Sequence, residues 1–436
     1  MSRLFVVIAL ATFLVGPTGE ADGPTVPARV QGEYFVDGAG RPVFVLGANY
    51  EGPVDRAWQM WDDQLFDPAL IAKDFDRARA ANLSVLRVFV QRPLAADIRA
   101  GRWAKLDRVL DLADRRGLGL VLTFADYGEV DLAALAAIDA AVAARYRGRP
   151  TLFAFDLMNE PHFSELALAR YPPGVAVALQ DPALVTAVGE TIAPRDIADH
   201  RGSEQGRRDI PGHLDDDQAY VYANLLAAYR GFLRDGWAWA RAHDATPVRY
   251  LRSPDSAGWD PLKGALDDAL AAWMTPRLDA LRSADPGRPV TVGYGDPILA
   301  SLPANDRLDY RTLHHYPAAS LEGVRASGVL FDDVRAAIPG KPLVLGEFGF
   351  STAALDEQEA AALEVGTVHA VRESRGAGAL KWMLNDFPNG HDPHENALGL
   401  YRADGSAKPV VAAFRALGAL HPPSESQADR PAPGRP

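Results

Sequence analysis

The stretch Leu152–Pro161, which reads LFAFDLMNEP, decides the fold class of this chain. Its first part, Leu152–Leu157, is apolar except for Asp156. A short, nearly continuous apolar run predicts a strand of a parallel sheet, because such strands are covered on both faces. A carboxylate, Glu160, stands just beyond the run, where the strand is expected to end. The stretch therefore predicts a buried strand that delivers polar side chains to one edge of a sheet.

The same arrangement recurs along the chain. Eight apolar runs are predicted as strands: Val43–Ala48, Val85–Val90, Leu118–Phe124, Leu152–Leu157, Val290–Tyr294, Tyr310–His314, Leu343–Glu347 and Ala379–Leu384. Helices are predicted between them: Pro68–Asn82, Trp103–Arg116, Leu132–Arg147, Leu266–Ala284, Leu321–Ala337, Asp356–Arg375 and Pro409–Leu420. Eight strands alternating with helices favour an α/β fold closed into a (β/α)8 TIM barrel over an open doubly wound sheet. The first strand is not followed by a glycine-rich phosphate-binding motif, which also weighs against a dinucleotide-binding sheet.

The barrel is predicted to span residues 30–420, and one interval breaks its rhythm. Residues 165–261 follow the fourth strand and exceed what a crossover helix needs, so they are predicted to be an insertion. Its place after a strand puts it on the face where barrel enzymes bind substrate. Within it, Ala219–Ala242 is predicted to be a helix. The insertion is interpreted either as a lid or cleft wall, or as a decoration that buries its own aromatic side chains.

The two ends of the chain are predicted to lie outside the barrel. Arg3 followed by the apolar run Leu4–Val15 is typical of a secretory signal, and it is too short to span a bilayer comfortably. Residues 1–22 are therefore predicted to be a signal peptide of a secreted or periplasmic protein, with a retained anchor as the alternative. Before the first strand, Tyr34–Leu46 is predicted to be a hairpin. Residues 421–436 are rich in proline and serine and are predicted to be disordered.

Composition narrows the classes of partner. The chain is 48% hydrophobic and 23% charged, which are globular values. A formal net charge of −12 argues against a nucleic acid or an anionic membrane as partner, and it is compatible with a neutral polymer such as a carbohydrate. The absence of cysteine excludes disulfides, thiolate metal sites and cysteine nucleophiles. No cofactor and no metal site are predicted, and the protein is expected to be a monomer.

Two glutamates stand where apolar strands end. Glu160 follows the fourth predicted strand, and Glu347 ends the seventh in Leu345-Gly346-Glu347-Phe348-Gly349. The carboxyl ends of barrel strands converge on one face, so residues far apart in sequence can meet there. Cleavage of a glycosidic bond needs two such carboxyl groups, one protonated to release the leaving oxygen and one ionised. Either glutamate alone is better explained as a solvated strand end, but the pair predicts this chemistry.

The motifs resemble those of the clan of retaining β-glycosidases that includes glycoside hydrolase family 5. Asn159-Glu160-Pro161 is similar to the motif that ends the fourth strand in that family, and Glu347 in Gly-Glu-Phe-Gly is similar to its seventh-strand nucleophile. Further positions match on the expected strands: Arg87 on the second, His314 and Tyr316 after the sixth, and Trp382 on the eighth. The resemblance covers about residues 30–420 apart from the insertion.

The resemblance implies a role for each matched residue. Glu160 is expected to be the acid/base and Glu347 the nucleophile. Arg87 is permanently charged and is expected to keep Glu347 ionised, while Tyr316 donates a hydrogen bond to it. The other three are expected near the sugar: Asn159 at its 2-hydroxyl, His314 beside the acid/base or a hydroxyl, and Trp382 as an apolar floor. The implied substrate is a β-linked polysaccharide, β-mannan or β-glucan, cut in the middle of the chain.

Several alternatives stay open at this point. Asp126 stands where family members often carry a histidine, which leaves the family within the clan open. One alternative is that His315, rather than His314, faces the site. Two others are that Arg87 forms a purely structural ion pair and that Trp382 only fills the core. The loop His391–Glu395 is rich in metal-ligand side chains, and a metal-dependent barrel hydrolase would lose activity on chelation. Other functions considered are an exo-acting β-glycosidase on short oligosaccharides or glycoconjugates, and a glycan-binding barrel without catalysis.

Overall fold

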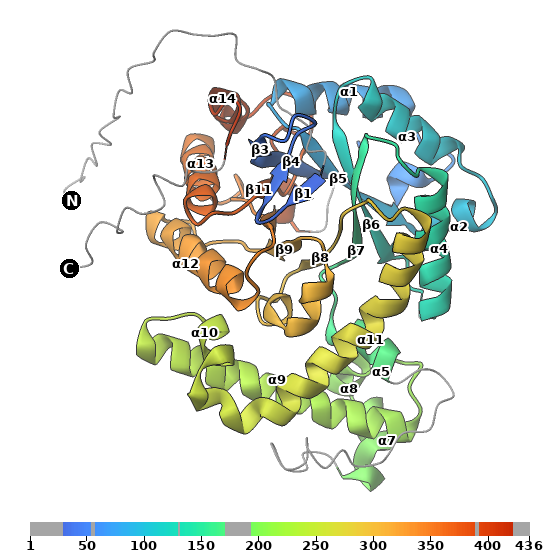
Figure 1. Ribbon diagram of the computed structural model, residues 1–436, viewed down its shortest axis with the longest axis vertical. Helices are drawn as coiled ribbons and strands as arrows, with labels where there is room; N and C mark the ends of the chain where they lie inside the picture. Colours follow the sequence, from blue (N-terminus) through green and yellow to red (C-terminus); the bar gives the residue numbers. More distant parts are fainter. Residues whose placement is uncertain (1–28, 54–56, 130, 171–192, 389–391, 422–436) are drawn as a thin grey trace.

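The computed structural model describes residues 29–53, 57–129, 131–170, 193–388 and 392–421 (Figure 1). The predicted signal peptide and nearly all of the predicted tail lie outside these residues. Eight parallel strands close into a barrel in the order β10-β11-β4-β5-β6-β7-β8-β9, which confirms the predicted fold class. Their bounds are β4 Val45–Tyr50, β5 Val85–Gln91, β6 Gly119–Asp126, β7 Leu152–Asn159, β8 Val290–Tyr294, β9 Arg311–His314, β10 Leu343–Glu347 and β11 Gly378–Lys381.

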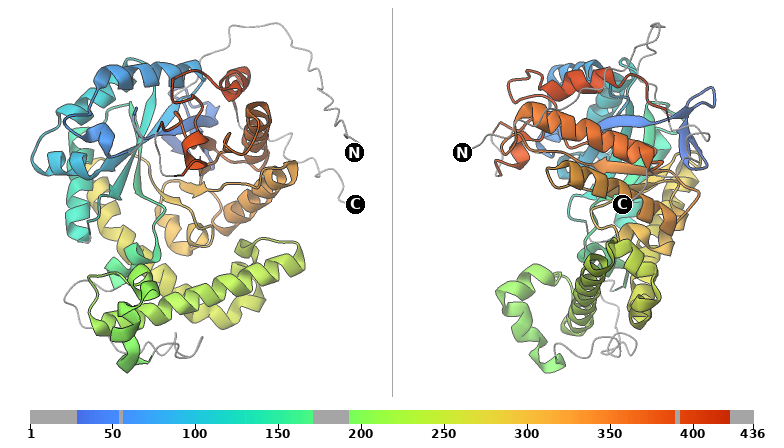
Figure 2. Two further views of the ribbon diagram at one scale, coloured as in Figure 1. Left: turned by 180° about the vertical axis from the view of Figure 1, so that it is seen from behind. Right: turned by 90° about the vertical axis from the view of Figure 1, so that its left-hand side faces the viewer.

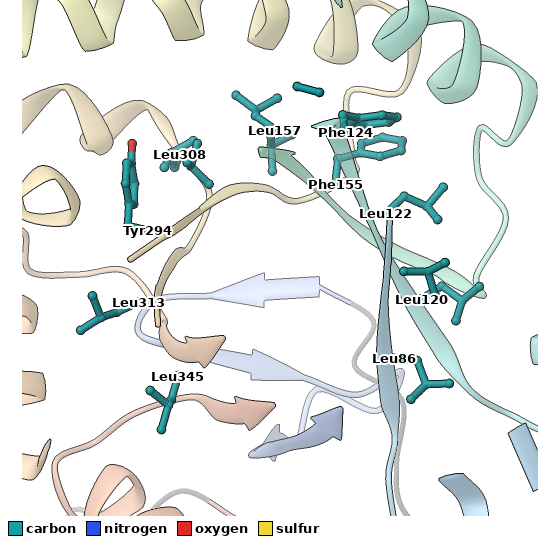
Figure 3. Close-up of a cluster of buried hydrophobic side chains, with 14 of the residues drawn as sticks. Leu86, Leu120, Leu122, Phe124, Phe155, Leu157, Tyr294, Leu308, Leu313 and Leu345 are labelled. Atoms are coloured by element: carbon teal, nitrogen blue, oxygen red, sulfur yellow. The ribbon is translucent and has the colours of Figure 1, made fainter. Parts of the chain in front are cut away.

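Seven helices occur at the predicted places around the barrel: α1 Pro68–Ala80, α3 Ala104–Asp114, α4 Leu132–Arg145, α11 Asp260–Ala284, α12 Leu321–Ala337, α13 Glu357–Glu373 and α14 Pro409–Ala416. An additional short helix, α2 (Arg92–Arg99), follows β5 directly and is not among the predicted helices. Between strands and helices lies the main hydrophobic core, to which Leu86, Leu122 and Leu313 contribute (Figure 3). Among the described residues, no helix is long and apolar enough to cross a membrane.

A small antiparallel sheet precedes the barrel and contributes to a second core. It consists of β1 (Arg29–Gln31), β2 (Tyr34–Val36) and β3 (Pro42–Val43), which confirms the predicted hairpin. Its Phe35 is fully buried and packs edge-on against Phe153 and Tyr310, with ring centroids 5.0 and 5.2 Å away. These rings belong to a separate apolar cluster built from strand residues such as Val85. The sheet therefore covers one end of the barrel with apolar side chains.

The described part of the segment between β7 and β8 is mostly helical. It contains α5 (Phe163–Arg170), α7 (Ile197–Gly202), α8 (Glu204–Asp209), α9 (Asp216–His243) and α10 (Pro247–Arg252), and it leads into α11. These helices form a lobe on one side of the barrel (Figures 1 and 2). The long helix α9 begins at a capping box, in which the side chains of Asp215 and Gln218 bond each other's backbone N–H. One face of α9 packs in a small core of the lobe, while Tyr229 and Phe232 join the main core.

Short 3-10 turns complete the described chain, at Gln59–Trp61, Pro194–Asp196, Pro254–Trp259, Leu299–Ser301, Pro303–Arg307 and Glu395–Ala397. The turns at Leu299–Ser301 and Pro303–Arg307 follow β8 and direct the chain into β9. Asp296, two residues beyond β8, and Leu299 in the first turn line a pocket together with Glu160. The carboxyl end of the barrel is therefore bordered both by strand ends and by the lobe.

Candidate active site

The structure brings the two predicted glutamates together. Glu160 lies one residue beyond β7, and Glu347 is the last residue of β10. One carboxylate oxygen of each, together with a ring nitrogen of His314, lie within 4.8 Å of one another. Convergence of strand ends on one face explains how residues distant in sequence form this group.

Glu347 is buried and held by two donors. Arg87 Nη1 donates a hydrogen bond to its Oε1 at 2.8 Å, and the Tyr316 hydroxyl donates to its Oε2 at 2.9 Å. Burial by itself lowers the pKa of Arg87, but the neighbouring carboxylates of Asp156 and Glu347 raise it. Arg87 therefore stays charged, and its ion pair with Glu347 fixes the orientation of that carboxyl group. Burial and the adjacent Glu347 raise the pKa of Tyr316 well above its usual range, so its hydroxyl remains a donor.

Arg87 is itself fixed by residues that the sequence did not single out as part of the site. Asp156 accepts hydrogen bonds from Arg87 Nε at 2.9 Å and from Nη2 at 2.7 Å. Asn49 Oδ1 accepts from Arg87 Nη1 at 2.9 Å, and its amide donates to the Gly346 carbonyl at 2.9 Å. Both Asp156 and Asn49 are fully buried. The signal that could have found them is a polar residue inside an otherwise apolar strand, since such a group needs a buried partner.

The acid/base candidate Glu160 is paired with His314. His314 Nδ1 lies 2.9 Å from Glu160 Oε1 and 3.3 Å from Glu347 Oε1. Carboxylates only accept hydrogen bonds, so we assign the ring proton to Nδ1. Nε2 is buried and has no hydrogen-bond partner in the described part of the chain. The hydrogen bond from His314 lowers the pKa of Glu160, against the opposing effect of burial.

Three glycines leave the space that these side chains occupy. A Cβ atom at Gly293 would lie 2.8 Å from Arg87 Nη2 and 2.8 Å from His314 Nε2. At Gly346 it would lie 2.9 Å from the His314 ring, and at Gly295 2.9 Å from Glu160 Cδ. The polar layer therefore depends on the absence of side chains at these positions.

The backbone at Glu160 is unusual for a residue with a side chain. Its φ is +43°, in the left-handed region that L-residues avoid. The conformation is held by a hydrogen bond from the Glu160 N–H to the Gly293 carbonyl at 2.7 Å. Such residues persist where the surrounding structure over-determines them, and they cluster at functional sites.

Both glutamates face a pocket of about 570 Å³, here called the Trp382 pocket. Trp382 and Tyr316 line it, and so do Phe350 and Leu355 from the chain after β10. Asn159 also lines the pocket, and its Oδ1 accepts a hydrogen bond from Arg87 Nη2 at 2.9 Å. This contact assigns the other amide atom, Nδ2, as the donor. The volume is within the range of small-molecule sites.

Other predicted residues are placed as follows. Asp126 is the last residue of β6, and its side chain lies outside the described part of the structure. Residues 389–391 are also outside it, and His394 and Glu395 line the Trp382 pocket. His315 does not contact either carboxylate through its ring, and its backbone N–H donates to the Glu347 carbonyl at 3.0 Å. The structure thus places His314, rather than His315, at the centre.

Among the residues that the structure describes, Glu160, His314 and Glu347 form the one group whose ligand atoms are close enough to hold a metal ion. Arg87 lies 2.8 Å from Glu347, and its positive charge opposes a second cation there. The His314 Nδ1 atom is already engaged by Glu160. These contacts favour proton transfer over metal binding at this centre.

No protein-family model matches this chain, and a search of curated proteins finds no match to its sequence. Solved structures do match its fold. One is the exo-β-1,4-mannosidase Op5Man5 from Opitutaceae bacterium strain TAV5, with 19% identity, a TM-score of 0.55, and coverage of 88% of this chain and 61% of that chain. Another is a GH5_18 protein from Streptomyces cattleya in complex with GlcNAc, with 16% identity, a TM-score of 0.54, and coverage of 90% and 82%.

A third similar structure is a β-glucuronidase from Ruminococcus gnavus in complex with D-glucuronic acid, with 15% identity, a TM-score of 0.51, and coverage of 89% of this chain and 51% of that chain. This chain therefore spans about three fifths of the mannosidase and half of the glucuronidase. At these identities the likeness establishes the fold. The chain has the (β/α)8 architecture on which these three proteins are built.

Proposed function

We propose that this protein is a retaining glycoside hydrolase acting on β-linked glycosides, with Glu347 as nucleophile and Glu160 as acid/base. The observation that carries the proposal is the short distance between the carboxylates, since one oxygen of Glu160 and one of Glu347 lie within 4.8 Å of each other. Retaining enzymes have their two carboxyl groups about 5–5.5 Å apart, whereas inverting enzymes need about 6.5–9.5 Å to admit a water.

In the first step, a Glu347 oxygen attacks the anomeric carbon and forms an ester bond. The bond from that carbon to the leaving oxygen breaks, and the leaving oxygen keeps the electron pair and takes the proton of Glu160. Arg87 and Tyr316 donate hydrogen bonds to the two Glu347 oxygens and so orient the carboxylate for this attack. Trp382 lines the same pocket and offers an apolar ring to a C–H face of the sugar.

In the second step, Glu160 takes a proton from a water whose oxygen attacks the anomeric carbon, and Glu347 leaves as a carboxylate. The protonation state of Glu160 has to alternate between the steps. In the free protein the His314 hydrogen bond lowers the pKa of Glu160. A bound sugar removes water and so raises this pKa, and esterification of Glu347 removes a nearby negative charge and so lowers it again. The same residue thus serves as acid and then as base.

The substrate is proposed as a β-mannoside or β-glucan, with a β-linked polysaccharide cut internally as the first candidate. A second candidate is an exo-acting enzyme on short oligosaccharides, and two observations favour it. The fold resembles a protein described as an exo-β-1,4-mannosidase. In addition, Phe163 and Tyr229, from the helices between β7 and β8, border a pocket beside Glu160. This supports a cleft-wall role for that segment. Export of the protein is proposed on its N-terminal sequence.

The test is hydrolysis of a panel of β-linked polysaccharides, oligosaccharides and aryl β-glycosides. We expect the wild type to cleave with retention of configuration and Glu347→Ala to lose turnover on all substrates. Glu160→Gln should lose activity on substrates with poor leaving groups, which need protonation. Glu359→Gln, an exposed carboxylate on α13, is the matched control and should behave as wild type. Near-normal turnover of Glu347→Ala would refute the assignment, and glycan binding without any cleavage would favour the non-catalytic barrel.

A further inference from the structure

The two catalytic carboxylates border two pockets of different composition. Both line the Trp382 pocket, of about 570 Å³. A second pocket, of about 430 Å³, is lined by Glu160 but not by Glu347, judged on the residues that the structure describes. The two pockets have Glu160 and Tyr316 in common. Since the acid/base must stand beside the leaving oxygen, the second pocket lies on the leaving-group side of the centre.

The outer wall of this second pocket is aromatic and comes from the lobe. Phe163 on α5 and Tyr229 on α9 stack with ring centroids 5.2 Å apart and planes 25° apart. The Tyr229 hydroxyl donates to the carboxylate of Asp296, which follows β8. Asp296 also accepts from the Ile298 N–H at 2.8 Å. The lobe is therefore fixed to the barrel at the pocket, and the wall is a preformed surface.

The polar groups of the second pocket suit an uncharged ligand rich in hydroxyl groups. His162, His315 and Asp296 line it, and no lysine or arginine does so among the described residues. Burial lowers the pKa of His315, so its ring is neutral at neutral pH. An anionic leaving group would face the carboxyl groups of Glu160 and Asp296, and no lysine or arginine of the described residues lines the pocket to offset them. A pyranose offers hydroxyls to these groups and an apolar C–H face to an aromatic ring.

We propose that the second pocket is a binding subsite for the leaving group, which it takes as an uncharged sugar, with Phe163 and Tyr229 as its wall. The inference rests on the proposed function and extends it. It means that the protein uses binding energy from the departing sugar to promote bond cleavage. A simple aryl or fluoride leaving group lacks the sugar and therefore supplies none of this binding energy.

The experiment compares two substrates that share a glycone, β-1,4-mannobiose and β-mannosyl fluoride, or the corresponding glucosides if the panel identifies glucose. Fluoride is too small to occupy the second pocket. In Phe163→Ala, kcat/KM for the disaccharide should fall about tenfold or more, whereas kcat/KM for the fluoride should change less than about twofold. Phe163→Leu is a milder variant and should show the same split to a smaller degree. Trp237→Ala, on α9 but 52% exposed, is the control and should change neither value.

A second readout is sugar transfer. With the fluoride as donor and free mannose as acceptor, the wild type should form disaccharide, and Phe163→Ala should form less of it per fluoride released. Equal losses on both substrates, or no loss on either, would overturn the subsite while leaving the proposed hydrolase intact. If the wild type cleaves neither substrate and the panel shows no other activity, the proposed function itself fails.

Discussion

Gly295→Ala is the substitution that most directly tests how Glu160 is placed. Gly295 follows β8, is exposed, and has a backbone conformation that alanine can adopt. An added Cβ would lie 2.9 Å from Glu160 Cδ and 3.0 Å from Oε1. Carbon atoms in contact prefer about 3.5–4.0 Å, so the carboxyl group must move by roughly 0.6–1 Å. The Glu160 side chain is 35% exposed and has room to do so.

The expected consequence is loss of proton transfer without loss of stability. Misplacement of a catalytic group by about 1 Å costs on the order of 100-fold in rate, or about 2.7 kcal/mol of transition-state stabilisation. Because Gly295 is exposed and its neighbour can move, the free energy of unfolding should change by less than about 0.5 kcal/mol. The matched control is Gly287→Ala, where a Cβ would meet nothing within 4 Å.

The assay is kcat/KM on two aryl β-glycosides with the same sugar. A phenyl leaving group needs protonation by Glu160, whereas a 2,4-dinitrophenyl group leaves without it. Gly295→Ala should lose about 100-fold on the phenyl substrate and less than about threefold on the dinitrophenyl substrate. An equal loss on both would show that the substitution disturbs Glu347 or the sugar pocket. Wild-type values on the phenyl substrate would refute the contact between Gly295 and the Glu160 carboxyl group.

Three further predictions concern proton transfer, stability and metals. His314→Ala removes the hydrogen bond that lowers the pKa of Glu160. The alkaline limb of the pH profile of kcat/KM, where the acid loses its proton, should therefore move to higher pH. A limb that stays in place or moves to lower pH would contradict this. Asp139→Ala leaves Arg277, fully buried and 2.7 Å from Asp139, without its partner, so urea unfolding should show a loss of about 3–5 kcal/mol; the exposed Asp76→Ala should lose under about 1 kcal/mol. Incubation with EDTA should leave hydrolysis unchanged, and a loss restored by a divalent cation would favour a metal at Glu160, His314 and Glu347.

The sequence predicts the barrel well because each strand is a short apolar run, and the strands begin within about two residues of their predicted places. Some boundaries of strands and helices differ from the prediction. Val43 belongs to β3 rather than to the first barrel strand, and β11 ends at Lys381 instead of Leu384. Pro261 is the predicted end of the insertion, yet it lies in the first turn of α11, where proline is favoured.

The candidate site, like the fold, could be predicted from the sequence only in part. The residues at strand ends were predictable because strand ends converge in a barrel. The contacts of Arg87 with Asn49 and Asp156 depend on which strand residues point inward, and the sequence indicates this only by isolated polar residues in apolar runs. The stacking of Phe163 on Tyr229 joins two helices of the lobe, α5 and α9, that are far apart in the sequence, and nothing local in the sequence specifies it.

The left-handed backbone of Glu160 sets catalysis and folding against each other at one residue. A residue with a side chain in this region costs about 1–2 kcal/mol relative to its ordinary conformations, and glycine does not bear this cost. The folded chain therefore keeps its proposed general acid at a position where glycine would be more stable. If the proposed role is correct, a descendant that no longer cleaves glycosides would gain stability by losing this side chain, so the centre would change first at Glu160 while the barrel around it remained folded.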